Sequence, residues 1–170
     1  MVARALTATC LVLGLACAPT SGTRDRVSAE GFGGVRVGMT VEEASNAHGS
    51  ALSPAVSIAD DERSCYYVFP RGAVGPVSFM IVDGRVARVD IDHPGPVTEA
   101  GVGVGSAESE VQSAYAGRIK VSPHKYTGPE GHYLTLEQGD FVIIFETNGT
   151  QVTSYRAGKL PEVAWVERCS

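Results

Sequence analysis

The sequence predicts an α+β fold of two tandem repeats, each a short helix packed on an antiparallel β-meander. Residues 34–44 (GVRVGMTVEEA) recur 67 positions later as residues 101–111 (GVGVGSAESEV), with glycines and valines in register. The same offset relates Cys65-Tyr66 to His132-Tyr133. Because self-similarity at a fixed offset is typical of duplicated units, the chain is expected to contain two copies of one unit.

Each half also contains a hairpin signal. Asp83-Gly84 follows the β-rich run 77–82, and Asn148-Gly149 follows the β-rich run 141–147. Both dipeptides favour a type I′ turn, whose two central residues need positive φ. We therefore expect one tight antiparallel hairpin in each half.

A short helix is expected near the start of each half. Thr40 is a suitable N-cap for the first helix, because Glu42 and Glu43 then lie in the first turn, where the helix dipole favours negative charge. Ser106 is expected to cap the second helix, over residues 108–115.

The remaining strands follow from β-rich runs after polar loops. They are expected over residues 64–69 and 132–136, with a last strand over residues 162–169 after Pro161. Residues 31–96 then form the first repeat and residues 97–170 the second.

The N-terminus predicts an exported protein. Residues 1–16 have the composition of a signal peptide, and their apolar run is too short to span a bilayer as a helix. The run ends in Leu13-Gly14-Leu15-Ala16-Cys17, which resembles the lipobox of bacterial lipoproteins, where the cysteine becomes the acylated first residue. Lipidation of Cys17 would place the protein in the periplasm, anchored to the outer membrane through a tether over residues 17–30. Ordinary cleavage after Ala16 would instead give a secreted soluble protein.

The cysteines predict one disulfide. If Cys10 leaves with the signal peptide and Cys17 carries lipid, Cys65 and Cys169 remain. An even pair outside the cytoplasm is typical of a disulfide, although two unpaired buried thiols are the alternative. The bridge would close a loop of roughly 100 residues, for which the chain-entropy model gives about 4.7 kcal/mol.

Charge argues against nucleic acid as a partner. The formal net charge is −5, and no run of basic residues is present to displace counterions from phosphates. Positive and negative residues alternate along the chain, a pattern typical of a solvated surface.

The glycine-rich opening of residues 34–44, with a helix and then a meander, resembles the repeat of β-lactamase inhibitor proteins. It is also similar to the small outer-membrane assembly lipoproteins, which carry one such unit behind a lipidated cysteine. The resemblance covers about the first dozen residues of each repeat and the order of elements. It implies non-enzymatic work on a partner protein. It transfers no functional residues, because the connecting segments differ.

Residues 123–133 carry more chemistry than a connector needs. We expect a binding surface there, because binding residues concentrate in loops held by a rigid sheet. The candidate residues are His124, Lys125, Tyr126, Glu130, His132 and Tyr133. The alternative is that His124 and Tyr126 hydrogen-bond the loop to the sheet while Glu130 faces water. The spacing of His124, Glu130 and His132 follows no structural-zinc pattern, so neither a metal nor another cofactor is expected.

Asp90-Ile91-Asp92-His93 is a second cluster of ionisable residues. Alternation places Asp90 and Asp92 on one strand face with Arg88, which could hold a cation or a carboxylate pair for hydrolysis. A solvated face opposite Val89 and Ile91 is the preferred interpretation. No nucleophile elbow or paired Ser and His supports catalysis, so no catalytic residues are assigned.

The sequence therefore favours a non-enzymatic cell-envelope binding protein, a protein-interaction or inhibitor-like module acting on an envelope or extracellular partner. A small-ligand or carbohydrate binder using residues 123–133 is the alternative, and a hydrolase is the third hypothesis.

Overall fold

The structure, a computed structural model, describes residues 26–59 and 64–169. The predicted signal peptide and Cys17 lie outside these residues. Residues 26–30, assigned from the sequence to the tether, belong to the fold instead. Val27 is fully buried and pairs with Thr98. The fold therefore begins inside the predicted tether, because this segment adds an apolar residue to the core.

The described chain is mainly β-structure with two α-helices. The elements are β1 (Arg26–Val27), β2 (Gly31–Phe32), β3 (Val35–Arg36), α1 (Val41–His48), β4 (Leu52–Ser53), β5 (Cys65–Pro70), β6 (Val77–Val82), β7 (Arg85–Ile91), β8 (Val97–Thr98), α2 (Glu108–Ala114), β9 (Ile119–His124), β10 (Gly128–Gln138), β11 (Phe141–Thr147), β12 (Val152–Lys159) and the 3-10 helix η3 (Glu162–Ala164).

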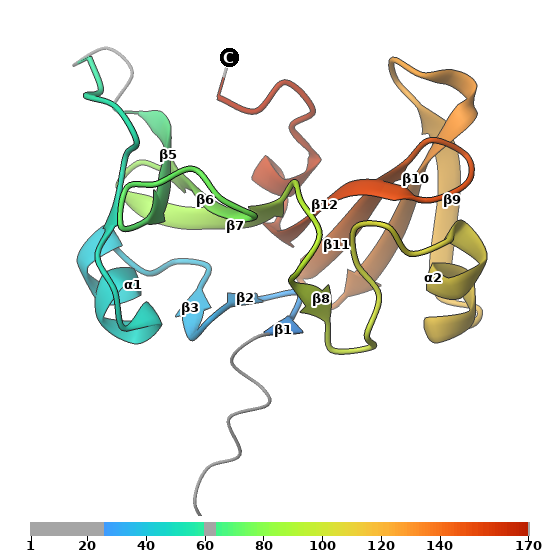
Figure 1. The fold of residues 1–170 in the computed structure, drawn as a ribbon, viewed down its shortest axis with the longest axis horizontal. Helices are drawn as coiled ribbons and strands as arrows, with labels where there is room; N and C mark the ends of the chain where they lie inside the picture. Colours follow the sequence, from blue (N-terminus) through green and yellow to red (C-terminus); the bar gives the residue numbers. More distant parts are fainter. Residues whose placement is uncertain (1–25, 60–63, 170) are drawn as a thin grey trace, which may run out of the picture.

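An eight-stranded antiparallel sheet forms the body of the molecule, in the order β4-β5-β6-β7-β12-β11-β10-β9. β7 and β12 meet in its middle, with pairs from Tyr155↔Ile91 to Gly158↔Arg88. α1 with β4–β7 lies on one side of this junction and α2 with β9–β12 on the other (Figure 1). The predicted α+β class is confirmed at this level.

The two helices cover one face of the sheet. Ala44 of α1 and Val111 of α2 are fully buried in the main core, with Phe79, Phe145 and Tyr155 of the sheet. Because strand side chains alternate between faces, every second residue of the central strands enters this core. The other face is left for the C-terminal segment.

α1 has the predicted N-cap. Thr40 Oγ1 accepts the backbone N–H of Glu43 at 3.2 Å, and the Glu43 carboxylate accepts the N–H of Thr40 at 2.8 Å. These reciprocal bonds satisfy two backbone donors that the first turn leaves free. The helix ends at Gly49, whose φ of 80° suits a residue without Cβ.

α2 begins at Glu108 as predicted, but its N-cap lies one residue later than predicted. Its N-cap is Ala107, not Ser106, and Glu110 accepts the N–H of Ala107 at 2.7 Å. The Ser106 hydroxyl instead accepts the backbone N–H of Gly103 at 3.1 Å. The hydroxyl therefore stabilises the turn before the helix rather than the helix itself.

The two hairpins differ. Asp83 and Gly84 have φ values of 48° and 76°, which confirms the tight turn with positive φ at both central residues. The second turn is wider, because Thr147 pairs with Val152 and Asn148 Oδ1 accepts two later backbone N–H groups at 3.0 Å. The Asn-Gly dipeptide therefore lies in a longer turn held by the asparagine side chain.

The C-terminal segment is not the predicted strand. After Pro161 it forms η3 and then a series of turns to Cys169. We call residues 161–169 the C-terminal strap. The strap crosses the sheet face opposite the helices, where Val163 is fully buried between β11 and its neighbours. The predicted disulfide between Cys65 and Cys169 is confirmed and joins the end of the strap to β5, with 5.4 Å between the Cα atoms.

Candidate functional site

The predicted binding loop is a hairpin between β9 and β10, and His124 shapes it. The imidazole stacks on the Tyr133 ring with 4.6 Å between centroids. Its Nδ1 accepts the backbone N–H groups of Tyr126 and Thr127 at 3.2 and 3.3 Å. Nε2 lies 3.3 Å from Glu146 Oε2. These contacts match the structural alternative for His124, which holds the hairpin closed.

The tip of this hairpin faces solvent. Tyr126 is 57% exposed, and Glu130 is exposed as well. Lys125 Nζ lies 5.0 Å from the centre of the Tyr126 ring and 2.8 Å from Glu167 Oε1 of the strap. Tyr126 and Glu130 therefore stay accessible, while Lys125 links the hairpin to the strap.

His132 lies on the opposite face of the sheet from Tyr133. Its Nδ1 is 2.8 Å from Glu108 Oε1 in the first turn of α2, and the same carboxylate accepts the Thr147 hydroxyl. This difference follows from strand geometry, because successive side chains point to opposite faces. The six candidate residues consequently do not converge on one site.

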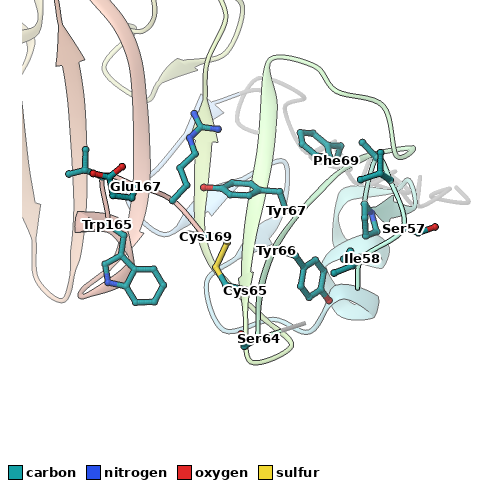
Figure 2. A pocket seen from close by; sticks show the side chains of 15 residues that line it. Ser57, Ile58, Ser64, Cys65, Tyr66, Tyr67, Phe69, Trp165, Glu167 and Cys169 are labelled. Carbon is teal, nitrogen blue, oxygen red and sulfur yellow. A yellow bond between two sulfur atoms is a disulfide. The ribbon is translucent and has the colours of Figure 1, made fainter. Parts of the chain in front are cut away.

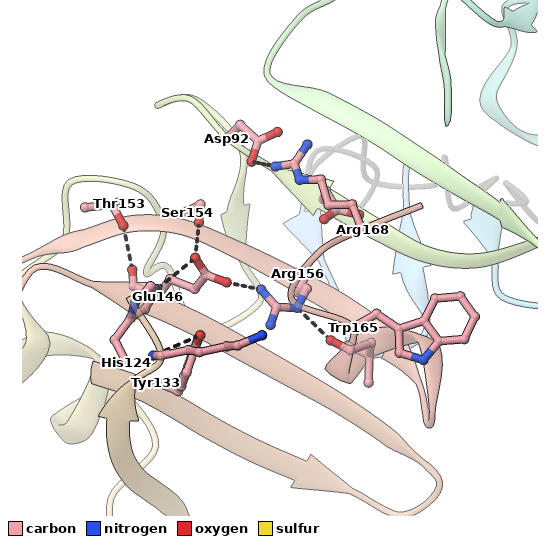
Figure 3. A network of polar contacts seen from close by, with 12 residues as sticks. Asp92, His124, Tyr133, Glu146, Thr153, Ser154, Arg156, Trp165 and Arg168 are labelled. Carbon is pink, nitrogen blue, oxygen red and sulfur yellow. Dashed lines mark hydrogen bonds and ion pairs between the residues drawn. The ribbon is translucent and has the colours of Figure 1, made fainter. Parts of the chain in front are cut away.

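Glu146 is the centre of a polar network on the strap face (Figure 3). Its carboxylate accepts a hydrogen bond from Arg156, and Arg156 Nε donates to the Val163 carbonyl of the strap at 2.6 Å. Burial raises the pKa of Glu146, but the hydrogen bond and charge of Arg156 outweigh it and hold that pKa below its usual value. Glu146 is thus a fixed carboxylate that orients Arg156 toward the strap.

Arg88 and Asp90 form a second polar cluster, and their burial corrects the predicted solvated face. Their exposed fractions are 1% and 3%, and Arg88 Nε donates to Asp90 Oδ2 at 2.9 Å. Arg88 Nη2 also donates to the Tyr67 hydroxyl at 2.8 Å. Burial raises the pKa of Asp90, against the opposing charge of Arg88. The polar side chains of this face therefore contact the strap, and they are not exposed to solvent.

Arginine side chains hold the strap to the sheet, from the sheet itself and from the strap. Arg88 Nη1 donates to the carbonyls of Glu162 at 2.9 Å and Trp165 at 2.7 Å. Farther along, Arg168 Nη2 donates to Asp92 Oδ1 at 2.6 Å, as Figure 3 shows. Hydrogen bonds from charged donors are stronger than those between neutral groups, so these contacts direct the path of the strap.

A groove of about 900 Å³ opens between the strap, β5 and the loop after β4 (Figure 2). Its lining is largely apolar and aromatic, with Tyr66, Tyr67 and Phe69 from β5 and Trp165 from the strap. Residues 54–58 form the outer wall, where Val56 is 78% exposed. Cys65 and Cys169 both line the groove, so the disulfide joins its β5 wall to its strap wall.

The charged residues that line the groove already have partners. Glu167 bonds to Lys125, and Arg168 bonds to Asp92. Figure 2 shows Tyr66 and Tyr67 pointing to opposite sides of β5. The groove therefore presents aromatic surface on both sides of one strand, with its charges neutralised.

Sequence reasoning missed this groove. The run Cys65-Tyr66-Tyr67-Val68-Phe69 places large side chains on both faces of one strand, which is unusual where one face meets water. This run was the available signal. Trp165 carried no local signal, because its position depends on the path of the strap.

Within residues 26–59 and 64–169, no group of three or more His, Cys, Asp or Glu residues is placed to hold a metal ion. None of the helices over the same residues is long and apolar enough to cross a membrane.

Comparison with known proteins adds no relative. No family model, curated protein or solved structure matches the chain.

Proposed function

We propose that the protein is a non-enzymatic binding module that holds an envelope or extracellular protein in the groove along β5. The observation that carries the proposal is the aromatic lining of a groove whose charged residues are already paired. Apolar and aromatic surface of this kind is typical of protein interaction sites. The exposed Val56 at its rim is the least protected part of that surface.

The state of the two acids on the strap face, Asp90 and Glu146, supports binding over catalysis. Asp90 and Glu146 each accept a hydrogen bond from an arginine, so both carboxylates are engaged in holding the strap face together. A general acid or base must reach a substrate proton. These two carboxylates are directed to arginines instead.

An oxidising compartment is part of the proposal. A disulfide that ties the strap to β5 suits a protein outside the cytoplasm. We propose a periplasmic location with Cys17 lipidated and anchored to the outer membrane. A soluble secreted protein cleaved after Ala16 is the alternative.

We infer further that the chain contains two copies of one structural unit. Gly38 N–H donates to the Val86 carbonyl at 2.8 Å, and Gly105 N–H donates to the Val152 carbonyl at 2.9 Å. Both glycines have a φ of 92°. The two halves also share an order of one helix and four strands. These equivalences support the tandem arrangement expected from the 67-residue offset.

A carbohydrate is the second candidate ligand. Trp165 is 37% exposed and lines the groove, where its aromatic ring can stack on a sugar face. Trp165 is the single tryptophan, so its fluorescence reports directly on the groove. An oligosaccharide that shifts this emission at micromolar concentration would favour the second candidate.

Affinity capture from an envelope extract tests the leading proposal. Full-length protein is immobilised as wild type, Val56→Asp and Val121→Asp. Val56 and Val121 are both exposed, at 78% and 52%, but only Val56 lines the groove. A charge placed against an apolar partner costs roughly 2 kcal/mol or more, so Val56→Asp should retain at least about tenfold less partner.

The Val121→Asp variant controls for added charge and should capture as much partner as wild type. Equal capture by all three proteins would contradict the groove as the binding surface. Circular dichroism of each variant shows that the fold is kept.

A further inference from the structure

β5 is covered by a neighbour along only part of its outer edge. β4 pairs with it at Leu52↔Pro70 and Ser53↔Phe69, and the chain then leaves the sheet along residues 54–58. On the other side of the sheet β9 pairs with β10 as far as Leu136↔Ile119. The stretch of β5 before Phe69 therefore has β6 on one side and the groove on the other.

The register shows which backbone groups face the groove. Asp83 N–H donates to the Ser64 carbonyl at 3.0 Å, and β5 then pairs with β6 without a shift from Cys65↔Val82 to Val68↔Phe79. Because hydrogen-bonded pairs alternate along an antiparallel ladder, Cys65 and Tyr67 turn their backbone groups away from β6. In the described part of the chain these groups have no hydrogen-bond partner.

The two edges of the sheet, at β9 and at the part of β5 that β4 leaves unpaired, differ in protection. β9 carries Lys120 and Pro123, which are residues that discourage pairing with another strand. The part of β5 that β4 leaves unpaired, residues 65–68, contains no charged residue and no proline. An apolar edge of this kind is suited to receive a strand.

The groove extends over both faces of this edge. Tyr66 and Ile58 line it on the side of α1, and Tyr67, Phe69 and Trp165 line it on the side of the strap. An extended segment paired with β5 would direct alternate side chains to these two surfaces. A ligand bound to one face alone would leave the other surface unfilled.

We propose that the edge of β5 receives an extended segment of the partner protein, which pairs with Cys65 and Tyr67 as a ninth strand of the sheet. The inference rests on the proposed function and specifies its mode. The segment is uncharged where it meets the groove, because Glu167 and Arg168 are already paired. The uncovered stretch, Ser64 to Val68, spans roughly 16 Å at about 3.3 Å per residue, so the segment provides four to six residues.

An array of N-acetylated, C-amidated octapeptides tests this mode, with apolar residues alternating with Ser or Thr. Binding to full-length protein is measured by Trp165 fluorescence, and the best peptide is made again with N-methyl groups at one or the other alternate set of residues. Methylation of the set facing β5 should weaken binding about tenfold or more, because it removes intermolecular hydrogen bonds. Methylation of the other set should change binding less than about twofold.

Amide hydrogen exchange supplies an independent readout. In the free protein the amides of Cys65 and Tyr67 should exchange fast and those of Tyr66 and Val68 slowly. The bound octapeptide should slow exchange at Cys65 and Tyr67. The Val56→Asp variant should bind the octapeptide more weakly than wild type, and the Val121→Asp variant should bind it equally well.

The proposal is overturned if no arrayed peptide binds, if both methylated sets bind equally, or if Cys65 and Tyr67 stay unprotected. It is also overturned if binding survives Val56→Asp unchanged. If the Val56→Asp variant still fails to capture the envelope partner, these results overturn only the mode of binding, and the proposed function is retained. If capture itself is independent of Val56, the proposed function fails as well.

Discussion

Removal of the disulfide should reveal how much the strap depends on it. The change is Cys65→Ser with Cys169→Ser, which opens a loop with a sequence separation of 104 residues. The chain-entropy model gives a loss of about 4.7 kcal/mol for a loop of this length. The structure describes 140 residues, for which unfolding entropy is about 0.3 kcal/mol per kelvin, so the melting temperature should fall by roughly 15 °C.

The folded double variant should still hold the first part of the strap. Arg88 keeps its hydrogen bonds to the Glu162 and Trp165 carbonyls, and Arg156 keeps its bond to the Val163 carbonyl. Native Trp165 emission should therefore change little, although stability falls. The bridge acts mainly on the unfolded chain, whereas the arginines act on the folded one.

Urea and thermal unfolding of full-length protein check this prediction, followed by Trp165 fluorescence and circular dichroism. A dithiol reductant should destabilise the wild type to the level of the double variant and leave the variant unchanged. A difference below about 1 kcal/mol between wild type and variant would refute the loop-entropy reasoning. A large shift in native Trp165 emission would refute the role given to the arginines.

Three further predictions concern single residues. Gly158→Ala should lower the free energy of unfolding in urea by roughly 1–3 kcal/mol, because the new Cβ would lie 2.6 Å from the backbone of β7. Gly75→Ala is the control and should be nearly neutral, because the atom nearest its Cβ would be 3.9 Å away. Equal effects of the two substitutions would contradict this. Glu146→Gln should flatten the acid side of the stability profile. Arg156 lowers the folded-state pKa of Glu146 despite burial, so the unfolded wild type takes up more protons than the folded protein at acid pH. The stability of the wild type therefore falls as the pH drops below about 4.5 and through the folded-state pKa. An equally steep fall in the variant would oppose the assignment. Tyr126→Ala should leave the melting temperature within about 2 °C, because its side chain is 57% exposed, and a larger fall would show that the ring supports the hairpin.

Local chemistry accounts for the features that the sequence predicted correctly. Thr40 and Glu43 cap α1 through bonds within four residues, and Asp83-Gly84 makes its turn because both residues accept positive φ. The disulfide followed from counting cysteines, since Cys65 and Cys169 were the pair left over. The cap and the turn could be predicted from neighbouring residues alone. The disulfide also required the compartment, which was inferred from the N-terminus.

The candidate site was less predictable. Residues 123–133 were chosen for their chemical richness, but the hairpin uses His124 and Tyr133 to hold its own turn and places His132 on the far face. A strand of alternating side chains separates neighbours in sequence, so composition alone could not show convergence. Tyr126 is the member of the set whose exposure fits the original hypothesis best.

The sequence by itself determined the α+β class, the cap of α1, the first tight turn and the cysteine pair. Only the tertiary structure decided the fate of Arg88 and Asp90, whose charges predicted solvent on their strand face. The strap covers that face because Arg88 and Arg156 hydrogen-bond to its carbonyl groups. Those contacts join residues more than seventy positions apart in one case, and no local pattern encodes them. The groove beside β5 has the same origin, because its walls come from three separate segments that meet only when the strap is bonded to the sheet.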